Sequence, residues 1–277
     1  MHETAQHLPE APAATTYAVS GIRYGTLRSR KSELYLRYEA YGEPDAEADM
    51  AYFFWVLEGG GRVLLVDSGF DPDVGRRRGR TPLIGQRDAL EGIGVDPAAV
   101  EVVIVTHMHY DHIGGLDLFP QAELIVPQPE LEFWTSPMAR RRQFAAHVEE
   151  AEIAYVRDAV AEGRVRETQG GEEVAPGVRL IAVGGHSPGQ QMVVVETASG
   201  PLLITSDAVH FYEELELDRP FGVCADLEAM YRAYDVVRRL EAERGVAVVP
   251  SHDPLVLERY AAVGEQTPYA VRLTGSQ

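Results

Sequence analysis

Four residues of the kinds that bind metal ions lie within six positions: His107, His109, Asp111 and His112. They directly follow the apolar stretch 101–106, which predicts a buried strand. Alternate residues at a strand end point to one side, so His107 and His109 can reach a common point. After the turn, Asp111 and His112 can face a second point nearby. Imidazole nitrogens and carboxylate oxygens bind zinc and similar metals, and four ligands from one loop favour a pair of ions.

Three later predicted strands each end at a further candidate ligand. His186 follows RLIAVGG, Asp207 follows PLLITS, and His252 follows GVAVVPS. A single histidine after a strand is usually an ordinary hydrogen-bonded residue. Burying this many ionisable groups without a metal would be costly, however, so the combined pattern favours metal binding. As a carboxylate, Asp207 can bridge two ions.

The elements that must position these residues follow from hydrophobic periodicity and turn signals. Strands are predicted at 17–26, 52–57, 62–67, 101–106, 179–183, 192–196, 201–205 and 245–250, and helices at 83–93, over most of 128–163, and at 226–243. Residues 1–15 are predicted to be a flexible tail, 16–277 a single domain, 27–50 a long excursion and 69–82 a loop. Strands and helices mixed in both halves favour a layered α/β or α+β domain.

Composition narrows the function classes. The 277 residues carry 25 Lys and Arg against 43 Asp and Glu, a net charge of −18. This acidity argues against binding nucleic acid or an anionic membrane, because both require a basic surface. The single cysteine, Cys224, excludes an internal disulfide and a cysteine-based zinc finger. With no signal-peptide pattern and no apolar run of membrane-spanning length, we expect a soluble, cytoplasmic protein.

Five short motifs together resemble the metallo-β-lactamase-fold superfamily. They are VDSG (66–69), HMHYDH (107–112), GGHSPGQ (184–190), SDA (206–208) and SHD (251–253), in that order over roughly residues 52–255. The resemblance implies a four-layer αββα sandwich with two divalent metal ions at one edge of the sheets. Zinc is the first expectation, and iron, manganese or cobalt are alternatives, because histidine and aspartate suit them all.

The resemblance also implies how the ligands divide. One ion would take His107, His109 and His186, the other would take Asp111, His112 and His252, and Asp207 would bridge them. Asp67, in the VDSG motif, would support a ligand through a hydrogen bond instead of binding metal, although a plain turn residue at a strand end is an equal alternative.

Within the superfamily, the chain most resembles the N-acyl-homoserine lactonases, notably over SDAVHFYEELELDRPF (206–221) and the helix after it. That resemblance implies a quorum-quenching hydrolase that opens a small-molecule lactone by attack of a metal-bridged hydroxide. We expect a monomer or homodimer. Asp111 would orient the hydroxide and pass a proton to the leaving oxygen. The tyrosine expected three residues after the bridging aspartate is His210 here, so His210 or Tyr212 would assist the carbonyl. Core packing is the alternative for both.

Other functions stay open at this point. Gln190 and Ser251 also depart from the lactonase pattern, so a hydrolase of another lactone or ester, such as a pyridoxolactonase-like enzyme, is the main alternative. A nuclease or phosphodiesterase is disfavoured by the charge. A thioester hydrolase resembling glyoxalase II lacks room for an added helical domain after His252. Cys224 is not placed to serve as a β-lactamase ligand, and a complete ligand set argues against metal binding without catalysis.

Two arginine clusters and several aromatic residues each allow a structural and a functional interpretation. The arginines at 76–78 and 80 and at 140–142 are expected on solvated surface, the alternative being an anchor for an acidic substrate group. Most of the aromatics are expected in the core, the alternative being an apolar wall for an acyl chain; they are Phe133, Trp134, Phe144, Phe211, Tyr212 and Phe221. The histidines at 2, 7 and 147 are expected to be structural or solvated.

Overall fold

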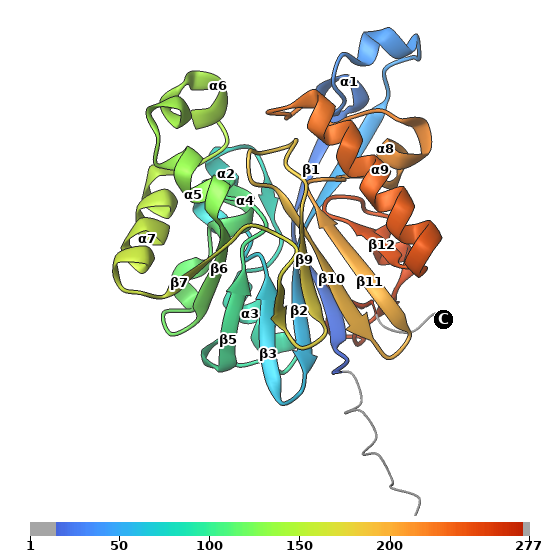
Figure 1. The fold of residues 1–277 in the computed structure, drawn as a ribbon. Coiled ribbons are helices and arrows are strands. Elements are labelled where there is room, and N and C mark those ends of the chain that lie inside the picture. Colours follow the sequence, from blue (N-terminus) through green and yellow to red (C-terminus); the bar gives the residue numbers. More distant parts are fainter. Residues whose placement is uncertain (1–14, 274–277) are drawn as a thin grey trace, which may run out of the picture.

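The computed structural model describes residues 15–273, and in it two β-sheets pack face to face (Figure 1). The first sheet contains β1 (Ala18–Arg30), β2 (Glu47–Gly59), β3 (Arg62–Val66), β4 (Thr81–Pro82), β5 (Val100–Ile104), β6 (Glu123–Pro127), β7 (Val165–Thr168), β13 (Ala261–Ala262) and β14 (Ala270–Arg272). The second contains β8 (Glu173–Ala175), β9 (Val178–Ala182), β10 (Gln191–Thr197), β11 (Gly200–Ser206) and β12 (Ala247–Pro250). A strand is found at each of the eight predicted positions.

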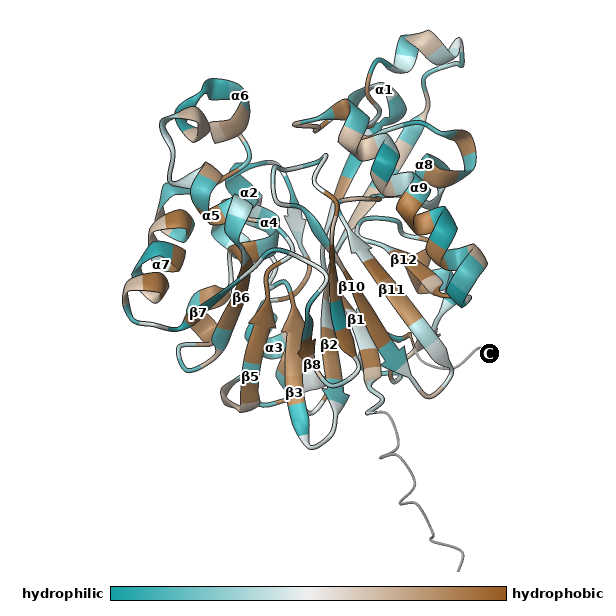
Figure 2. Ribbon diagram, in the orientation of Figure 1, coloured by the Kyte–Doolittle hydropathy of each residue, from teal (hydrophilic) through white to brown (hydrophobic). Residues whose placement is uncertain are grey.

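The strands are apolar on both faces because each sheet is covered on both sides. In β5 and just after it, Val102 and Ile104 face the second sheet, whereas Val103 and Val105 face the outer helices. This alternation is the period of two that extended backbone imposes. It explains why EVVIVT has no polar face, and Figure 2 shows the same apolar strands between more polar helix surfaces.

Helices cover the outer face of each sheet, as Figure 1 shows. Outside the first sheet lie α2 (Pro72–Arg77), α3 (Gln86–Gly92), α4 (Tyr110–Ile113), α5 (Gln128–Trp134), α6 (Arg142–Ala145) and α7 (Glu150–Ala161). Outside the second lie α8 (Tyr212–Leu217) and α9 (Leu227–Arg244). Asp226 caps the start of α9, and Gly245, with φ of 63°, ends it. Three separate apolar layers result, which is the packing of an αββα sandwich.

Parallel pairing brings strand ends to one edge of the sandwich. β3, β5 and β6 are mutually parallel in the first sheet, and β11 and β12 are parallel in the second. The carboxyl ends of parallel strands meet at the same edge of a sheet. The residues that follow β5, β11 and β12 therefore lie close in space although they are far apart in the sequence.

The predicted excursion at 27–50 is mostly regular structure, so that prediction was wrong. β1 runs on to Arg30 and β2 begins at Glu47, with these two residues paired. Between them lie α1 (Lys31–Leu34) and the 3-10 helix η1 (Tyr38–Tyr41). Tyr35 forms a β-bridge with Phe221, which docks this extended hairpin against the segment after β11. The strands at both ends of this segment were not predicted because their solvent-facing residues are charged, which made the stretch resemble a loop.

Smaller differences concern element ends. The predicted loop 69–82 contains α2. The Asp71 side chain caps this helix by accepting from the backbone amides of Asp73 and Val74, and Pro72 is its first residue. The helical stretch 128–163 is broken between α5 and α7 by η4 (Pro137–Arg140) and α6. The remaining short helices are η2 (Pro97–Ala99), η3 (Leu116–Leu118) and α10 (Val256–Arg259). Residues 1–14 of the predicted tail lie outside the described residues. Within 15–273, no helix has both the length and the apolarity needed to cross a membrane.

Candidate metal centre

Three imidazoles from two segments form the first group, which we call the first triad: His107, His109 and His186. His109 Nδ1 lies 3.0 Å from His107 Nε2 and 2.8 Å from His186 Nε2. The Nδ1 of His186 donates to the backbone carbonyl of Val223 at 2.9 Å. Because a carbonyl only accepts, this bond leaves the Nε2 lone pair of His186 directed at the other two rings. One metal ion can therefore find three nitrogen ligands here.

Asp111, His112 and His252 form the second triad, on the other side of Asp207. Their candidate ligand atoms all lie within 4.8 Å of one another. His252 Nδ1 donates to the carbonyl of Ala51 at 2.9 Å, so its Nε2 also faces inward. Gly114 lets this loop pack closely against the segment of Asp71, since a Cβ on it would stand 2.7 Å from the backbone nitrogen of Asp71.

Asp207 lies between the two triads with one oxygen directed at each. Its Oδ1 lies 3.1 Å from His112 Nε2 and 3.2 Å from His252 Nε2. Its Oδ2 lies 3.3 Å from His186 Nε2. The carboxylate is almost completely buried. This is the arrangement required of a group that bridges two cations.

Asp67 holds His112 in position from behind. Its Oδ2 lies 2.7 Å from His112 Nδ1, and its Oδ1 accepts from the Thr106 amide at 2.8 Å. The Asp67 backbone is left-handed, with φ of 61°, a conformation that costs free energy for a residue with a Cβ. The hydrogen bonds fix the ring of His112 so that its Nε2 faces the other members of the second triad. The predicted supporting contact is therefore present, and Asp67 is more than a turn residue.

The donor set fits a pair of divalent ions. Burial, then neighbouring imidazoles, holds the pKa of His107 and His109 well below the ordinary value, so both rings are neutral and offer lone pairs. Burial alone would raise the pKa of Asp207, but His112, His252 and His210 outweigh it and hold that pKa well below the usual range.

Two of the candidate ligand atoms have no hydrogen-bond partner in the described part of the chain. His112 Nε2 and Asp207 Oδ1 are buried, and although they lie 3.1 Å apart they form no hydrogen bond. Buried polar atoms are rarely left unpaired, because desolvation is then uncompensated. A cation between them would satisfy both atoms.

The sequence profile described as Metallo-beta-lactamase superfamily matches residues 50–252. The chain belongs to this superfamily. An N-acyl homoserine lactonase from Bacillus sp is 28% identical over 238 residues, covering 76% of this chain and 89% of that relative. A lactonase from Bacillus thuringiensis is 34% identical over 135 residues, about half of each chain.

Solved structures agree on the fold. AidC, a dizinc quorum-quenching lactonase in complex with a homoserine product, superimposes with a TM-score of 0.70. It is 16% identical, with 87% of this chain and 92% of that one covered. The predicted fold class, a metallo-β-lactamase-type αββα sandwich, is confirmed. The superfamily match also covers all five motifs except the last residue of SHD.

His210 is placed beside the bridging carboxylate. Its Nε2 lies 3.1 Å from Asp207 Oδ2, and its Nδ1 lies 3.3 Å from Glu214 Oε1. The ring stacks on Phe221 at 3.7 Å between centroids. Burial lowers the pKa of His210, but the two carboxylates outweigh it and raise this pKa to about 9. This side chain lines the same pocket as the two triads.

Tyr212 packs in the core and is not among the residues that line the pocket of the two triads, which argues against a direct catalytic role. Its hydroxyl lies 3.3 Å from the Val248 carbonyl, and the Arg259 guanidinium lies 3.5 Å from its ring centre. The side chain is part of the core between the sheets. Tyr212 begins α8, and the turn into this helix directs its ring inward. These contacts favour core packing, the alternative interpretation of this residue.

The two triads open into a pocket of about 240 Å³, which we call the metal pocket. Several of its lining residues were not predicted as site residues: Leu27, Ser29, Glu33, Leu34, Met50, Tyr52, Arg80, Tyr110, His147 and Val223. His147, expected to be structural or solvated, lies with its ring centre 5.3 Å from that of His109. The extended hairpin 27–50 contributes to the same wall. Only tertiary contacts bring these residues to the pocket, so no local motif identified them, apart from Arg80, whose cluster had substrate anchoring as its alternative interpretation.

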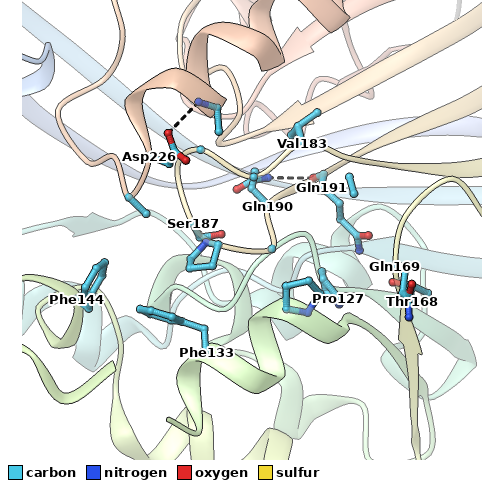
Figure 3. Close-up of a pocket in the computed structure, with 18 residues that line it drawn as sticks. Pro127, Phe133, Phe144, Thr168, Gln169, Val183, Ser187, Gln190, Gln191 and Asp226 are labelled. Carbon is cyan, nitrogen blue, oxygen red and sulfur yellow. Dashed lines mark hydrogen bonds between the residues drawn. The ribbon is translucent and has the colours of Figure 1, made fainter. Parts of the chain in front are cut away.

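A larger cavity, about 600 Å³, lies beside the loop 183–191 and is shown in Figure 3. Phe133, Phe144 and Pro127 face it from the α5–α6 side, and Gln190 and Gln191 line the opposite side. A third hollow shares His109 and His186 with the metal pocket. It also shares Phe144, Ser187, Pro188 and Ala225 with the larger cavity. The three hollows therefore adjoin one another.

Proposed function

We propose that this protein is a dinuclear metal-dependent lactonase that hydrolyses the ring of an N-acyl homoserine lactone. The observation that carries the proposal is the position of Asp207, with one oxygen facing each triad. Two superfamily relatives named N-acyl homoserine lactonase support the substrate class. Small-molecule lactones are thus the proposed partners, while the monomer-or-homodimer state and the cytoplasmic location stay predictions.

The proposed ligands follow the geometry. The first triad would hold one ion, the second triad would hold the other, and Asp207 would contact both. Zinc is the proposed metal, supported by the donor set and by the dizinc lactonase of the same fold. When bound, such a pair of ions lowers the pKa of water and polarises a carbonyl oxygen.

The protein side chains supply the remaining steps. Asp111 is nearly buried and lines the pocket, where it can orient the attacking water and deliver a proton to the leaving ring oxygen. His210 is the remaining candidate for donating to the developing oxyanion, because it lines the metal pocket and Tyr212 does not. Low water access around these groups strengthens their electrostatic effect.

The adjoining hollows suit an acyl chain. Trp134, Phe144 and Val223 line the hollow that shares His109 and His186 with the metal pocket. Phe133 and Pro188 continue an apolar wall into the larger cavity. An apolar chain leaving the ring at the first triad would bury its methylenes there, each worth about 0.8 kcal/mol.

Proton release by the zinc-loaded protein tests this proposal. The panel contains N-butanoyl and N-decanoyl homoserine lactones, γ-butyrolactone, a pyridoxolactone and a phosphodiester, with Asp111→Asn as control. We expect turnover of the homoserine lactones that Asp111→Asn reduces by about a hundredfold or more. Turnover of pyridoxolactone alone would favour the other-lactone alternative. Cleavage of the phosphodiester without lactone turnover would refute the proposal.

A further inference from the structure

Arg80 brings a positive charge into the metal pocket. It lines this pocket together with Tyr52, Tyr110 and Asp111. Its Nε donates to the hydroxyl of Tyr110 at 2.8 Å and to that of Tyr52 at 3.2 Å, and Nη1 donates to the carbonyl of Arg78. The guanidinium is therefore fixed in one orientation. The surface interpretation of this arginine cluster does not hold for Arg80.

All of these partners are neutral oxygens. In the described part of the chain, no carboxylate oxygen lies within ion-pair distance of Arg80, and none of its hydrogen bonds uses Nη2. The neighbouring Arg78 differs, because it pairs with Glu149 at 2.8 Å. Arg76 pairs with Asp73 in solvent. Arg80 is thus the member of its cluster that combines a pocket position with the lack of an ion pair in the described residues; Asp111 attracts it only from beyond ion-pair distance.

The acidic groups of the pocket are engaged elsewhere. Asp207 and Asp111 belong to the bridging position and the second triad. Glu33, on the hairpin side, accepts from the Ser29 hydroxyl at 2.6 Å and from the Arg30 amide at 3.2 Å. A half-buried guanidinium without a counter-ion binds carboxylates strongly, because the bonds are charge-assisted and partly shielded from water.

We propose that Arg80 binds an anionic group of the substrate, so that lactones carrying a carboxylate in addition to the ring are preferred. The inference rests on the proposed lactonase function and makes its substrate class narrower. Tyr52 and Tyr110 accept from Nε and hold the guanidinium in place, which leaves Nη2 free to donate to the carboxylate. The substrate is recognised at two points, with the ring ester at the triads and the carboxylate at Arg80.

The test compares lactones that differ only in charge. The first pair is N-succinyl homoserine lactone and its terminal amide, and the second is a γ-butyrolactone carboxylate and its carboxamide. We expect the zinc-loaded protein to prefer the acid in at least one pair by about tenfold to a hundredfold in kcat/KM. In Arg80→Gln this ratio should fall to about one, and Arg80→Lys should retain part of it. Arg76→Gln, from the same cluster but exposed, should keep the wild-type ratio.

A ratio near one in both pairs for the wild type, or an unchanged ratio in Arg80→Gln, would overturn the inference. Because each ratio is internal to one variant, a partly damaged fold does not mimic the result. If no lactone is turned over, the lactonase proposal fails separately. In that case, calorimetry measures the binding of ring-opened N-succinyl homoserine and of its amide to the zinc-loaded protein. Equal affinities in the wild type would refute the role of Arg80. A preference for the acid that is lost in Arg80→Gln would support it.

Discussion

The metal pocket and the cavity of Figure 3 adjoin the same loop, 183–191, yet their linings have little in common. The smaller, at about 240 Å³, combines histidines and carboxylates with apolar and tyrosine side chains. The larger, at about 600 Å³, is lined mainly by proline, phenylalanine, glycine and amide side chains. The size of a hollow therefore does not locate the chemistry. What locates it is the edge where the ends of β5, β11 and β12 converge.

The difference has a physical origin in the two sheets. Parallel strands deliver their carboxyl ends to one edge, where the following loops can aim several ligands at one point. The ends of β6, β7 and β9 also reach the larger cavity, but the residues they place there, Pro127, Thr168 and Ala182, are not metal ligands. We therefore assign catalysis to the first region and substrate packing to the second, and the following variants test that division.

Removing the bridging carboxylate should have the largest effect. Asp207→Ala deletes the one group that faces both triads, so we expect lactone turnover to fall by roughly a thousandfold or more. The fold should persist, because the apolar layers do not include this side chain. Proton-release kinetics measure the loss, and circular dichroism checks the fold. Activity within tenfold of wild type would show that Asp207 is not a bridge.

Asp67→Asn should have the next largest effect. The amide can no longer hold His112 Nδ1 as a carboxylate does, so the second triad should lose about tenfold to a hundredfold in metal affinity. Competition with a zinc chelator measures this. The matched control is Asp73→Asn, an exposed carboxylate outside the site. Equal zinc affinity in both variants would contradict the supporting role of Asp67.

A truncation in the larger cavity should separate binding from chemistry. Phe144→Ala should raise KM for N-decanoyl homoserine lactone by about tenfold, since several methylenes lose their contact. For the N-butanoyl lactone we expect a change of less than about twofold. Met138→Ala, at an exposed methionine nearby in the sequence, is the control. A loss of kcat that is equal for both chain lengths would place chemistry in this region after all.

Tyr212→Phe should have the smallest effect. The hydroxyl contacts the Val248 carbonyl in the core, so its removal should change kcat/KM by less than about twofold and lower the free energy of unfolding by about 1 kcal/mol. Urea unfolding and proton release measure the two quantities. A hundredfold loss of kcat would return Tyr212 to the catalytic set.

Much of the fold and the triad residues could be predicted from sequence because their signals are local. Buried strands such as 101–106 are continuous apolar runs, and the candidate ligands directly follow them. His147 gave no such signal, and the sequence singled out the cluster of Arg80 without showing which of its members reaches the pocket. Arg80 follows α2 and His147 follows α6, so only tertiary packing brings them to the pocket. Tyr212 was misplaced because its direction depends on the turn into α8. The hairpin at 27–50 was missed because one of its faces is charged.

Metal stoichiometry tests the central claim most directly. Zinc-loaded, desalted protein should contain two zinc ions per chain by elemental mass spectrometry. Each triad should account for one of them, so His186→Ala and His252→Ala should each retain about one ion under the same conditions. A wild-type content of one ion or none would contradict the two-triad account. Two ions retained in both variants would contradict it as well.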